Sequence, residues 1–236
     1  MKSVLYLICL LLCSSGTLSY EGHRISKQSH NDNIERPCPL SSMTCIRNYF
    51  QSKLGCGPLG EHILKPYYLE KITADMPHSN ASVRFEGVRL HGLNTGRITE
   101  FYINRDADIL VLEVELDKLI MDTERATIIY HRKGKEPLEV TDPSKAYIYG
   151  LSLTYTIRDF HGSRWGDQHV YAYLSHPKIN LKLGAAHVDN TGKDGDLINL
   201  KWFEDMKLTV AETLISLGPV YMTAFFQTKI CDMTIS

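Results

Sequence analysis

The sequence predicts an α+β fold, in which a long C-terminal helix lies against a curved antiparallel sheet. Apolar and polar residues alternate through the middle of the 236-residue chain, which is typical of strands with one solvated face. An apolar stripe at helical spacing follows in the last third of the chain. Turn-forming residues separate the alternating runs and favour antiparallel strands over helical crossovers.

The first segment, residues 1–19, is expected to be a secretory signal peptide. Lys2 precedes ten apolar residues, Val4 to Cys13, and small residues follow them. Ten helical residues rise only about 15 Å, too little to cross a bilayer core of about 30 Å. We expect residues 20–36 to form a flexible lead-in and residues 37–236 to form one domain that binds a hydrophobic ligand.

A short amphipathic helix is predicted to begin at Thr44. Apolar residues recur there at helical spacing, at Ile46, Tyr49, Phe50 and Leu54. Strands are predicted where the period is two, at residues 98–103, 110–117, 147–157, 169–173 and 179–183. In the run at 147–157 the odd-numbered residues are expected to share one face, so that Tyr147, Tyr149 and Tyr155 point the same way.

The C-terminal helix is predicted from one apolar stripe. Its members are Phe203, Met206, Val210, Leu214 and Leu217. Gly218-Pro219 is expected to break or kink this helix, because proline lacks the N–H that a helix interior requires. No segment after the signal peptide reaches about 18 uninterrupted apolar residues, so stable insertion into a membrane is not expected.

Four cysteines remain once the signal peptide is removed: Cys38, Cys45, Cys56 and Cys231. An even number of cysteines in a secreted chain suggests disulfide bonds. The preferred local bridge joins Cys38 to Cys45, which are close in sequence, while Cys56 and Cys231 either pair or stay free. Asn80-Ala81-Ser82 is the one glycosylation sequon, and it makes Asn80 a candidate glycosylation site.

Several function classes have little support in the sequence. The formal net charge of −1 argues against a nucleic-acid partner and supplies no polybasic membrane anchor. Gly55 to Gly60 matches a dinucleotide-binding glycine pattern, but no strand precedes it and Pro58 removes a donor. Asp189 to Asp196 resembles a calcium loop, yet it places Lys201 where the bidentate carboxylate belongs. The ten histidines show no metal-ligand spacing, so neither a metal nor a cofactor is expected.

The abundant apolar surface has two interpretations. It either fills a solid core or surrounds space for an apolar guest, and periodicity alone leaves both open. No nucleophile is assembled with its base in the sequence, so no catalytic residues are assigned and a secreted hydrolase is the weaker alternative. A signalling or interaction protein with a filled core is the other. From strand and helix phase, the residues expected to line a ligand site are Leu112, Val114, Leu151, Leu153, Tyr155, Phe203, Met206 and Val210.

Three segments resemble the insect takeout and juvenile-hormone-binding protein family. Pro37 to Cys45 has the family's Pro-Cys pair, with six residues before the next cysteine and a helix after it. Gly92 to Phe101 is similar to the family's entry into a strand. Asp189 to Asp196, followed by Asn199 and Trp202, is similar to its approach to the long helix.

This resemblance implies a secreted, extracellular carrier, in haemolymph or another fluid. The fold would be a highly curved antiparallel sheet wrapped around a long C-terminal helix, with an internal tunnel for juvenile hormone or a related terpenoid or fatty molecule. Cys38 and Cys45 match the family's N-terminal disulfide. The hormone binders' second bridge has no counterpart, which favours the takeout-like members. Tyr155 is nearest to the tyrosine whose hydroxyl contacts ligand in the hormone binders.

Overall fold

The computed structural model describes residues 33–54, 66–161, 170–175, 177–184 and 206–231. The signal peptide, the glycine pattern at 55–60, the calcium-like loop at 189–196, Cys56 and Phe203 lie outside these residues. The helices of the described part are α1 (Met43–Leu54), the 3-10 turn η1 (Leu93–Thr95), α3 (Met206–Phe225) and the π-helical turn η3 (Phe226–Ile230). The strands are β1 (Ile34–Glu35), β2 (Tyr67–Met76), β3 (Ala81–His91), β4 (Arg97–Asn104), β5 (Ile109–Tyr130), β6 (Leu138–Arg158), β7 (Val170–Leu174) and β8 (Lys178–Leu183).

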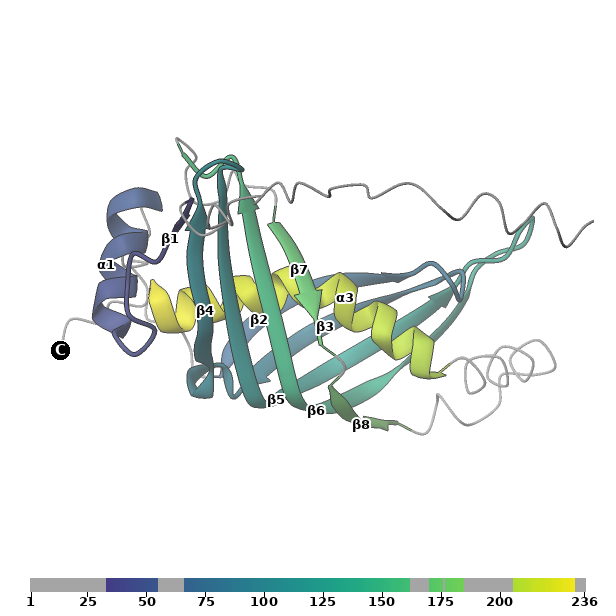
Figure 1. Ribbon diagram of the computed structural model, residues 1–236. Helices are drawn as coiled ribbons and strands as arrows, with labels where there is room; N and C mark the ends of the chain where they lie inside the picture. The colour runs from purple at the N-terminus through teal and green to yellow at the C-terminus, as the bar shows by residue number, and fades with distance from the viewer. Residues whose placement is uncertain (1–32, 55–65, 162–169, 176, 185–205, 232–236) are drawn as a thin grey trace, which may run out of the picture. The chain divides into compact units, whose positions relative to one another are not determined.

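One antiparallel sheet contains all the described strands, and β5 and β6 form its centre. The 22 residues of β5 pair with β6 along nearly their whole length. On its other side β5 pairs first with β4 and then with β3, which continues to β2. The short strands β7 and β8 follow one another along the outer edge of β6. The predicted α+β class, a large antiparallel sheet with a C-terminal helix, is therefore confirmed (Figure 1).

The long central strands change their inward face partway along. In β5 the buried positions run from Leu110 to Leu116 and then resume at Leu119, with Asp117 and Lys118 both exposed. In β6 the exposed pair is Tyr149 and Gly150, and Gly150 has a φ of +64°, which glycine adopts readily. Such interruptions of the alternation bend a sheet and re-aim the side chains that follow.

Because of this bend, the predicted phase of the strand at 147–157 is wrong for its first half. Leu151, Leu153 and Tyr155 point inward as expected, but Tyr147 and Tyr149 lie on the outer face while Ile148 is buried. The ammonium of Lys118 lies 5.5 Å from the ring centroid of Tyr147 and 5.6 Å from that of Tyr149. These two tyrosines therefore contact cations on the surface and supply no hydroxyl to the interior.

Helix α3 lies along the inner face of the sheet, where it contacts β2, β6 and β7 (Figure 1). Of the predicted stripe, Leu214 and Leu217 are buried, Met206 and Val210 are partly buried, and Phe203 lies outside the described residues. The helix continues through Pro219, contrary to the expected break. The carbonyl that loses its hydrogen bond belongs to Ile215, whose side chain is 58% exposed, so that turn of the helix faces water.

The segment Met206–Ile230 is long and apolar enough to cross a membrane, judged by length and composition alone. Its apolar character has a simpler explanation in this fold, because the described helix packs into the core. Thr209, Leu214, Leu217, Tyr221 and Phe225 are among its buried residues. A core helix of this kind passes the same composition test as a membrane span.

The N-terminal segment contains two predicted features. Helix α1 begins at Met43, one residue before its expected start, and it buries Ile46 and Phe50 completely. The predicted bridge between Cys38 and Cys45 is present, with a Cα–Cα distance of 5.7 Å. Cys231 is disulfide-bonded as well. Residues 34 and 35, expected to be irregular, form β1 against Ile103 and Asn104.

Two further strands, β2 and β3, are absent from the sequence prediction. β2 begins with three apolar residues in a row and then places Glu70 beside Lys71, which interrupts its alternation. β3 alternates cleanly on either side of Gly87, whose φ of +66° shifts the phase from Phe85 to Val88. A Cβ at Gly87 would lie 2.6 Å from the Glu124 carboxyl, so only glycine fits there without displacement.

Candidate ligand-binding cavity

A cavity lies between α3 and the inner face of the sheet. Its volume is about 80 Å³, counted as the space open to the centres of water-sized spheres. This is several times the roughly 10–15 Å³ that one water molecule needs on the same measure. The walls are Met76, Val83, Phe85, Met121, Ala126, Ile128, Ser144, Ala146, Ile148, Ile179, Leu181, Leu183, Thr209, Val210, Thr213, Leu214, Leu217 and Tyr221.

Small side chains account for the empty space. The inward positions of β5 and β6 at this end of the sheet include Ala126, Ser144 and Ala146. At the other end the corresponding positions hold larger residues such as Leu112 and Leu153, which are fully buried. Protein interiors are close-packed, so a stretch of short side chains opposite a straight helix leaves a gap. The cavity is therefore a consequence of residue size and not of strand pattern.

The cavity is nearer to solvent on one side than on the other. Met76 and Val83, from β2 and β3, are 2% and 4% exposed. Ile179, Leu181 and Leu183 point inward from the edge strand β8 but are only partly buried. The side of the cavity along β8 is therefore the natural route of entry for an apolar molecule.

Hydrogen bonds hold α3 at the opposite side, against the β2–β3 turn. The backbone N–H of Asp75 donates to Ser216 Oγ at 3.2 Å, and that of His78 donates to Glu212 Oε1 at 3.0 Å. The hydroxyls of Ser79 and Thr209 share a hydrogen bond of 2.7 Å. These contacts also satisfy backbone donors of β2 and the turn that follows it, which would otherwise lack partners in the sheet.

The cavity wall is almost entirely apolar. Its polar atoms are hydroxyls of Ser144, Thr209, Thr213 and Tyr221, and none of the described residues that line it is charged. Burial raises the pKa of the Tyr221 hydroxyl, so this group stays protonated and acts as a donor. An environment of this kind favours a neutral, mostly hydrocarbon guest over an ionised one.

Of the residues expected to line a ligand site, the cavity includes Val210. Met206 is partly buried at the start of α3, packs against the core and is not part of the wall. The strand residues of the expected set are fully or nearly fully buried and do not line the cavity: Leu112, Val114, Leu151, Leu153 and Tyr155. Contact of these residues with a ligand stays a prediction. Strand and helix phase shows which residues point inward, but the position of the cavity depends on how small those inward residues are.

An aromatic cluster occupies the end of the core that contains Tyr155. The Tyr155 ring centroid lies 5.2 Å from that of Phe226, which lies 5.0 Å from Phe50. Phe50 in turn stacks on Phe101 at 5.5 Å. Burial raises the pKa of the Tyr155 hydroxyl. This end of the structure is closed by packed rings from α1, β4, β6 and η3.

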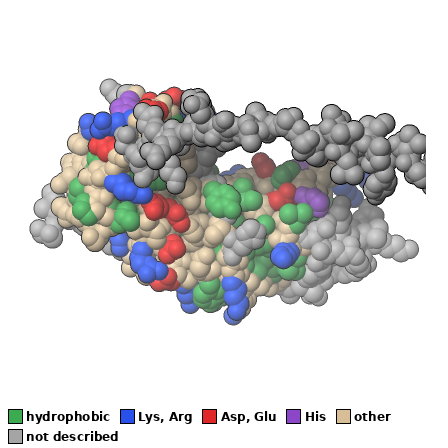
Figure 2. Space-filling model, viewed as in Figure 1, with side chains coloured by type: hydrophobic (Ala, Val, Ile, Leu, Met, Phe, Trp, Pro, Cys, Tyr) green, Lys and Arg blue, Asp and Glu red, His purple; other side chains and the backbone are tan. Residues whose placement is uncertain are grey.

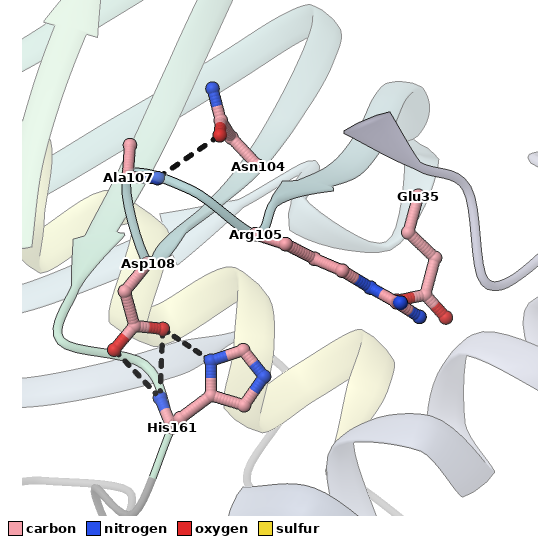
Figure 3. Close-up of polar contacts among 6 residues, drawn as sticks. All are labelled: Glu35, Asn104, Arg105, Ala107, Asp108 and His161. Atoms are coloured by element: carbon pink, nitrogen blue, oxygen red, sulfur yellow. Dashed lines mark hydrogen bonds and ion pairs between the residues drawn. The ribbon is translucent and has the colours of Figure 1, made fainter. Parts of the chain in front are cut away.

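A polar cluster closes the same end on the outside (Figure 3). Arg105 donates to the Glu35 carboxylate at 2.8 and 3.0 Å, which joins the β4–β5 turn to β1. The Asp108 carboxylate accepts a 3.1 Å hydrogen bond from the backbone N–H of His161 and also contacts the His161 ring. A His–Asp pair is part of many hydrolytic sites, but within the described residues no hydroxyl or thiol is bonded to this ring. The cluster is a structural connection between the turn and the end of β6.

Charges on the outer face of the sheet are paired across strands. Arg97 lies 3.4 Å from Glu115 and 3.2 Å from Asp117, and Arg36 lies 2.7 Å from Glu100. Figure 2 shows basic and acidic side chains interspersed on the face in view. Exposed pairs of this kind contribute little to stability, but they leave no large surface of one sign here to attract a polyanion.

These features define the class of protein: an α+β chain with an apolar cavity between a large antiparallel sheet and its C-terminal helix. Among solved structures, the chain is similar to Takeout 1 of Epiphyas postvittana, at 14% identity and a TM-score of 0.43, with 84% of this chain and 96% of that chain covered. It is also similar to lipopolysaccharide binding protein, at 11% identity and a TM-score of 0.29, covering 83% of this chain and 40% of that one.

A curated relative is Fibrohexamerin of Galleria mellonella, 25% identical over 137 residues. The match spans 58% of this chain and 56% of the relative. No protein-family model matches the chain.

Proposed function

We propose that this protein is a non-catalytic carrier of a small, slender hydrophobic molecule. The observation that carries the proposal is the apolar cavity between α3 and the sheet, in which the described wall is free of charge. Transfer of hydrocarbon from water into such a space contributes about 0.8 kcal/mol per buried CH₂ group. The proposed ligands are terpenoids and fatty molecules, juvenile hormone among them.

The cavity's dimensions restrict that class. A volume of about 80 Å³ is below the roughly 300 Å³ of the smallest typical ligand pockets, so a single unbranched or lightly branched chain fits better than a fused ring system. Met76 and Met121 line the wall, and methionine side chains adapt their shape more readily than branched ones. A longer chain would extend out along β8, where Ile179 and Leu181 are partly exposed.

Release into an extracellular fluid is part of the proposal. The signal-like N-terminal sequence and the Cys38–Cys45 disulfide both support it, because disulfides persist in oxidising compartments. Secretion is tested by expression in a eukaryotic secretory host. The medium is then analysed for the chain, and its N-terminus is sequenced for cleavage between residues 16 and 20.

The binding proposal is tested with the secreted chain and a fluorescent apolar probe, N-phenyl-1-naphthylamine. Methyl esters of chain lengths from about eight to sixteen carbons compete for the probe. Affinity is expected to rise by about fourfold for each added CH₂ and then to level off once the chain outgrows the cavity. Native mass spectrometry identifies any apolar molecule that copurifies.

A matched pair of variants locates the site. Ala146→Phe places a ring into the cavity and is expected to abolish probe binding. Asn180→Phe adds the same ring on the exposed face of the neighbouring strand, where Asn180 pairs with Tyr147, and is expected to leave binding unchanged. Circular dichroism melting shows whether both variants are folded. Equal binding by both, or none by the wild-type chain, would favour an interaction protein with a filled core.

A further inference from the structure

Three buried hydroxyl groups lie near the cavity residue Met121; those of Ser144 and Tyr221 belong to residues of the cavity wall, and Thr123 lies directly behind the wall on β5. Met121 is an inward residue of β5 that lines the cavity. Tyr221 on α3 contacts it, Thr123 follows it on the same face of β5, and Ser144 lies directly across from Thr123 on β6. These hydroxyls differ from those of Thr209 and Thr213 elsewhere in the wall, which are already hydrogen-bonded to Ser79 and to the Thr209 carbonyl.

The Tyr221 hydroxyl has a weak partner. The side chain is fully buried and lines the cavity, and its O–H donates to the sulfur of Met121 at 3.5 Å. A thioether sulfur is a poor acceptor compared with oxygen. An oxygen atom brought in by a guest would therefore replace this contact with a better one.

The Thr123 hydroxyl has no hydrogen-bond partner within the described part of the chain, although the residue is only 2% exposed. Ser144 lines the cavity beside it and is 8% exposed. A buried hydroxyl without a partner costs roughly 1–3 kcal/mol, so such a group in a folded protein calls for an explanation. An oxygen atom of a bound guest would satisfy the Thr123 hydroxyl by accepting its hydrogen bond.

The charge of the guest is limited by the same walls. No lysine, arginine or histidine lines the described cavity, so a carboxylate at the hydroxyl cluster would be buried without a counter-ion. A neutral oxygen needs only the donors that are present. Ester, ketone, epoxide and alcohol groups meet this requirement, and ionised acids do not.

We propose that the hydroxyls of Tyr221, Thr123 and Ser144 form a head-group subsite, which selects hydrophobic chains carrying one neutral oxygen function over alkanes and over free acids. The inference rests on the proposed function, since it concerns the same cavity. Tyr221 donates to the oxygen of the ligand, and the Thr123 and Ser144 hydroxyls complete its surroundings. The hydrocarbon chain then extends along α3 toward β8.

The test compares three probes of equal chain length, methyl laurate, lauric acid and dodecane, by displacement of N-phenyl-1-naphthylamine at pH 7.5. The wild-type chain is expected to bind methyl laurate about tenfold more tightly than dodecane and at least tenfold more tightly than lauric acid. Tyr221→Phe and Thr123→Val are each expected to remove most of the ester preference while leaving dodecane affinity within about twofold. Tyr130→Phe deletes a buried hydroxyl outside the cavity wall and is expected to keep the preference.

The outcomes separate this inference from the proposed function. Equal binding of all three probes, tighter binding of lauric acid, or an ester preference that survives in both Tyr221→Phe and Thr123→Val would overturn the subsite and leave the carrier function standing. Failure of all three probes to displace the reporter from the wild-type chain would overturn the carrier function itself, and the subsite with it. Loss of dodecane binding in Tyr221→Phe would show a packing role in place of a hydrogen bond and would also overturn the inference.

Discussion

The backbone N–H of His78 donates a hydrogen bond to the Glu212 carboxylate at 3.0 Å, which joins the β2–β3 turn to the helix α3. The contact links residues 134 positions apart in the sequence. Together with the neighbouring contact from Asp75 to Ser216, it fixes one long side of α3. The other side faces β8, where the lining residues are partly exposed.

Removal of the Glu212 carboxylate is expected to loosen the helix. Glu212→Ala deletes the acceptor for His78, and a hydrogen bond to a charged, partly exposed group is worth about 1 kcal/mol, so the free energy of unfolding should fall by that amount. Glu212→Gln keeps an acceptor oxygen and should lie closer to wild type. Urea denaturation measures both. Equal losses in the two variants would mean that the charge, and not the hydrogen bond, stabilises the contact.

Alanine substitutions at two glycines with positive φ distinguish the cost of backbone strain from the cost of a steric clash. Gly150 has a φ of +64° and nothing within 4 Å of the position that a methyl group would take, so Gly150→Ala should cost only the conformational strain of about 1 kcal/mol. At Gly92, with a φ of +97°, a Cβ would lie 2.2 Å from the carbonyl oxygen of Lys118. Gly92→Ala should therefore lose several kcal/mol more. Thermal melts of the two variants side by side would contradict this if their Tm values fell equally.

A pair of leucine truncations distinguishes the core from the cavity wall. Leu153 is fully buried away from the cavity, so Leu153→Ala should lower the free energy of unfolding by about 2–5 kcal/mol and leave ligand affinity within about twofold. Leu214 lines the cavity, and Leu214→Ala enlarges it. That variant should accept bulkier, branched esters that the wild-type chain excludes. Probe displacement and urea denaturation measure both effects. Altered ligand selection in Leu153→Ala would show that the buried strand residues contact the ligand.

Alkaline pH is expected to destabilise the fold through its buried tyrosines. Burial raises the pKa of Tyr130 from 10.0 to about 12, and burial is also the main cause that raises the pKa of Tyr49 to about 12, with Glu35 adding to it and Arg105 opposing it. Between pH 10 and 12 the unfolded chain loses these protons while the folded chain keeps them. These two tyrosines should therefore not change the free energy of unfolding below pH 10, and they should make it fall as the pH rises above 10.

For Tyr130, which is 8% exposed, the decline is about 1.4 kcal/mol per pH unit in that window. Tyr130→Phe should make the decline shallower by that amount. Urea midpoints measured from pH 9 to 11.5 give the slope for both chains. A variant slope identical to that of wild type would show that this phenol ionises before unfolding.

Periodicity predicted a C-terminal helix and its buried side, but not its extent, because the helix continues through Pro219. Val210, Leu214 and Leu217 face the sheet because a 3.6-residue repeat of apolar side chains has one buried side wherever the helix docks. The phase of β6 could not be obtained in this way. Its alternation continues without a break in the sequence, while the positive φ of Gly150 turns Tyr147 and Tyr149 outward. The bend shows in the structure as two exposed neighbours on each strand, Asp117 with Lys118 on β5 and Tyr149 with Gly150 on β6.

The cavity was beyond the reach of sequence patterns for a different reason. Ala126 and Ala146 are ordinary inward residues in their own strands, and they create space because both line the same cavity beneath α3. That coincidence depends on the register of β5 with β6, which includes an irregularity between Thr123 and Ala126. A one-residue change in such a register would move every inward side chain to the outer face.

The place of α3 in the chain has a consequence for biosynthesis. A ribosome makes the described strands first, so the inner surface of the sheet, with Leu112, Leu153 and their neighbours, emerges before the helix that covers it. During that interval the nascent chain exposes a concave apolar surface, which is covered only after the residues of α3 have been made.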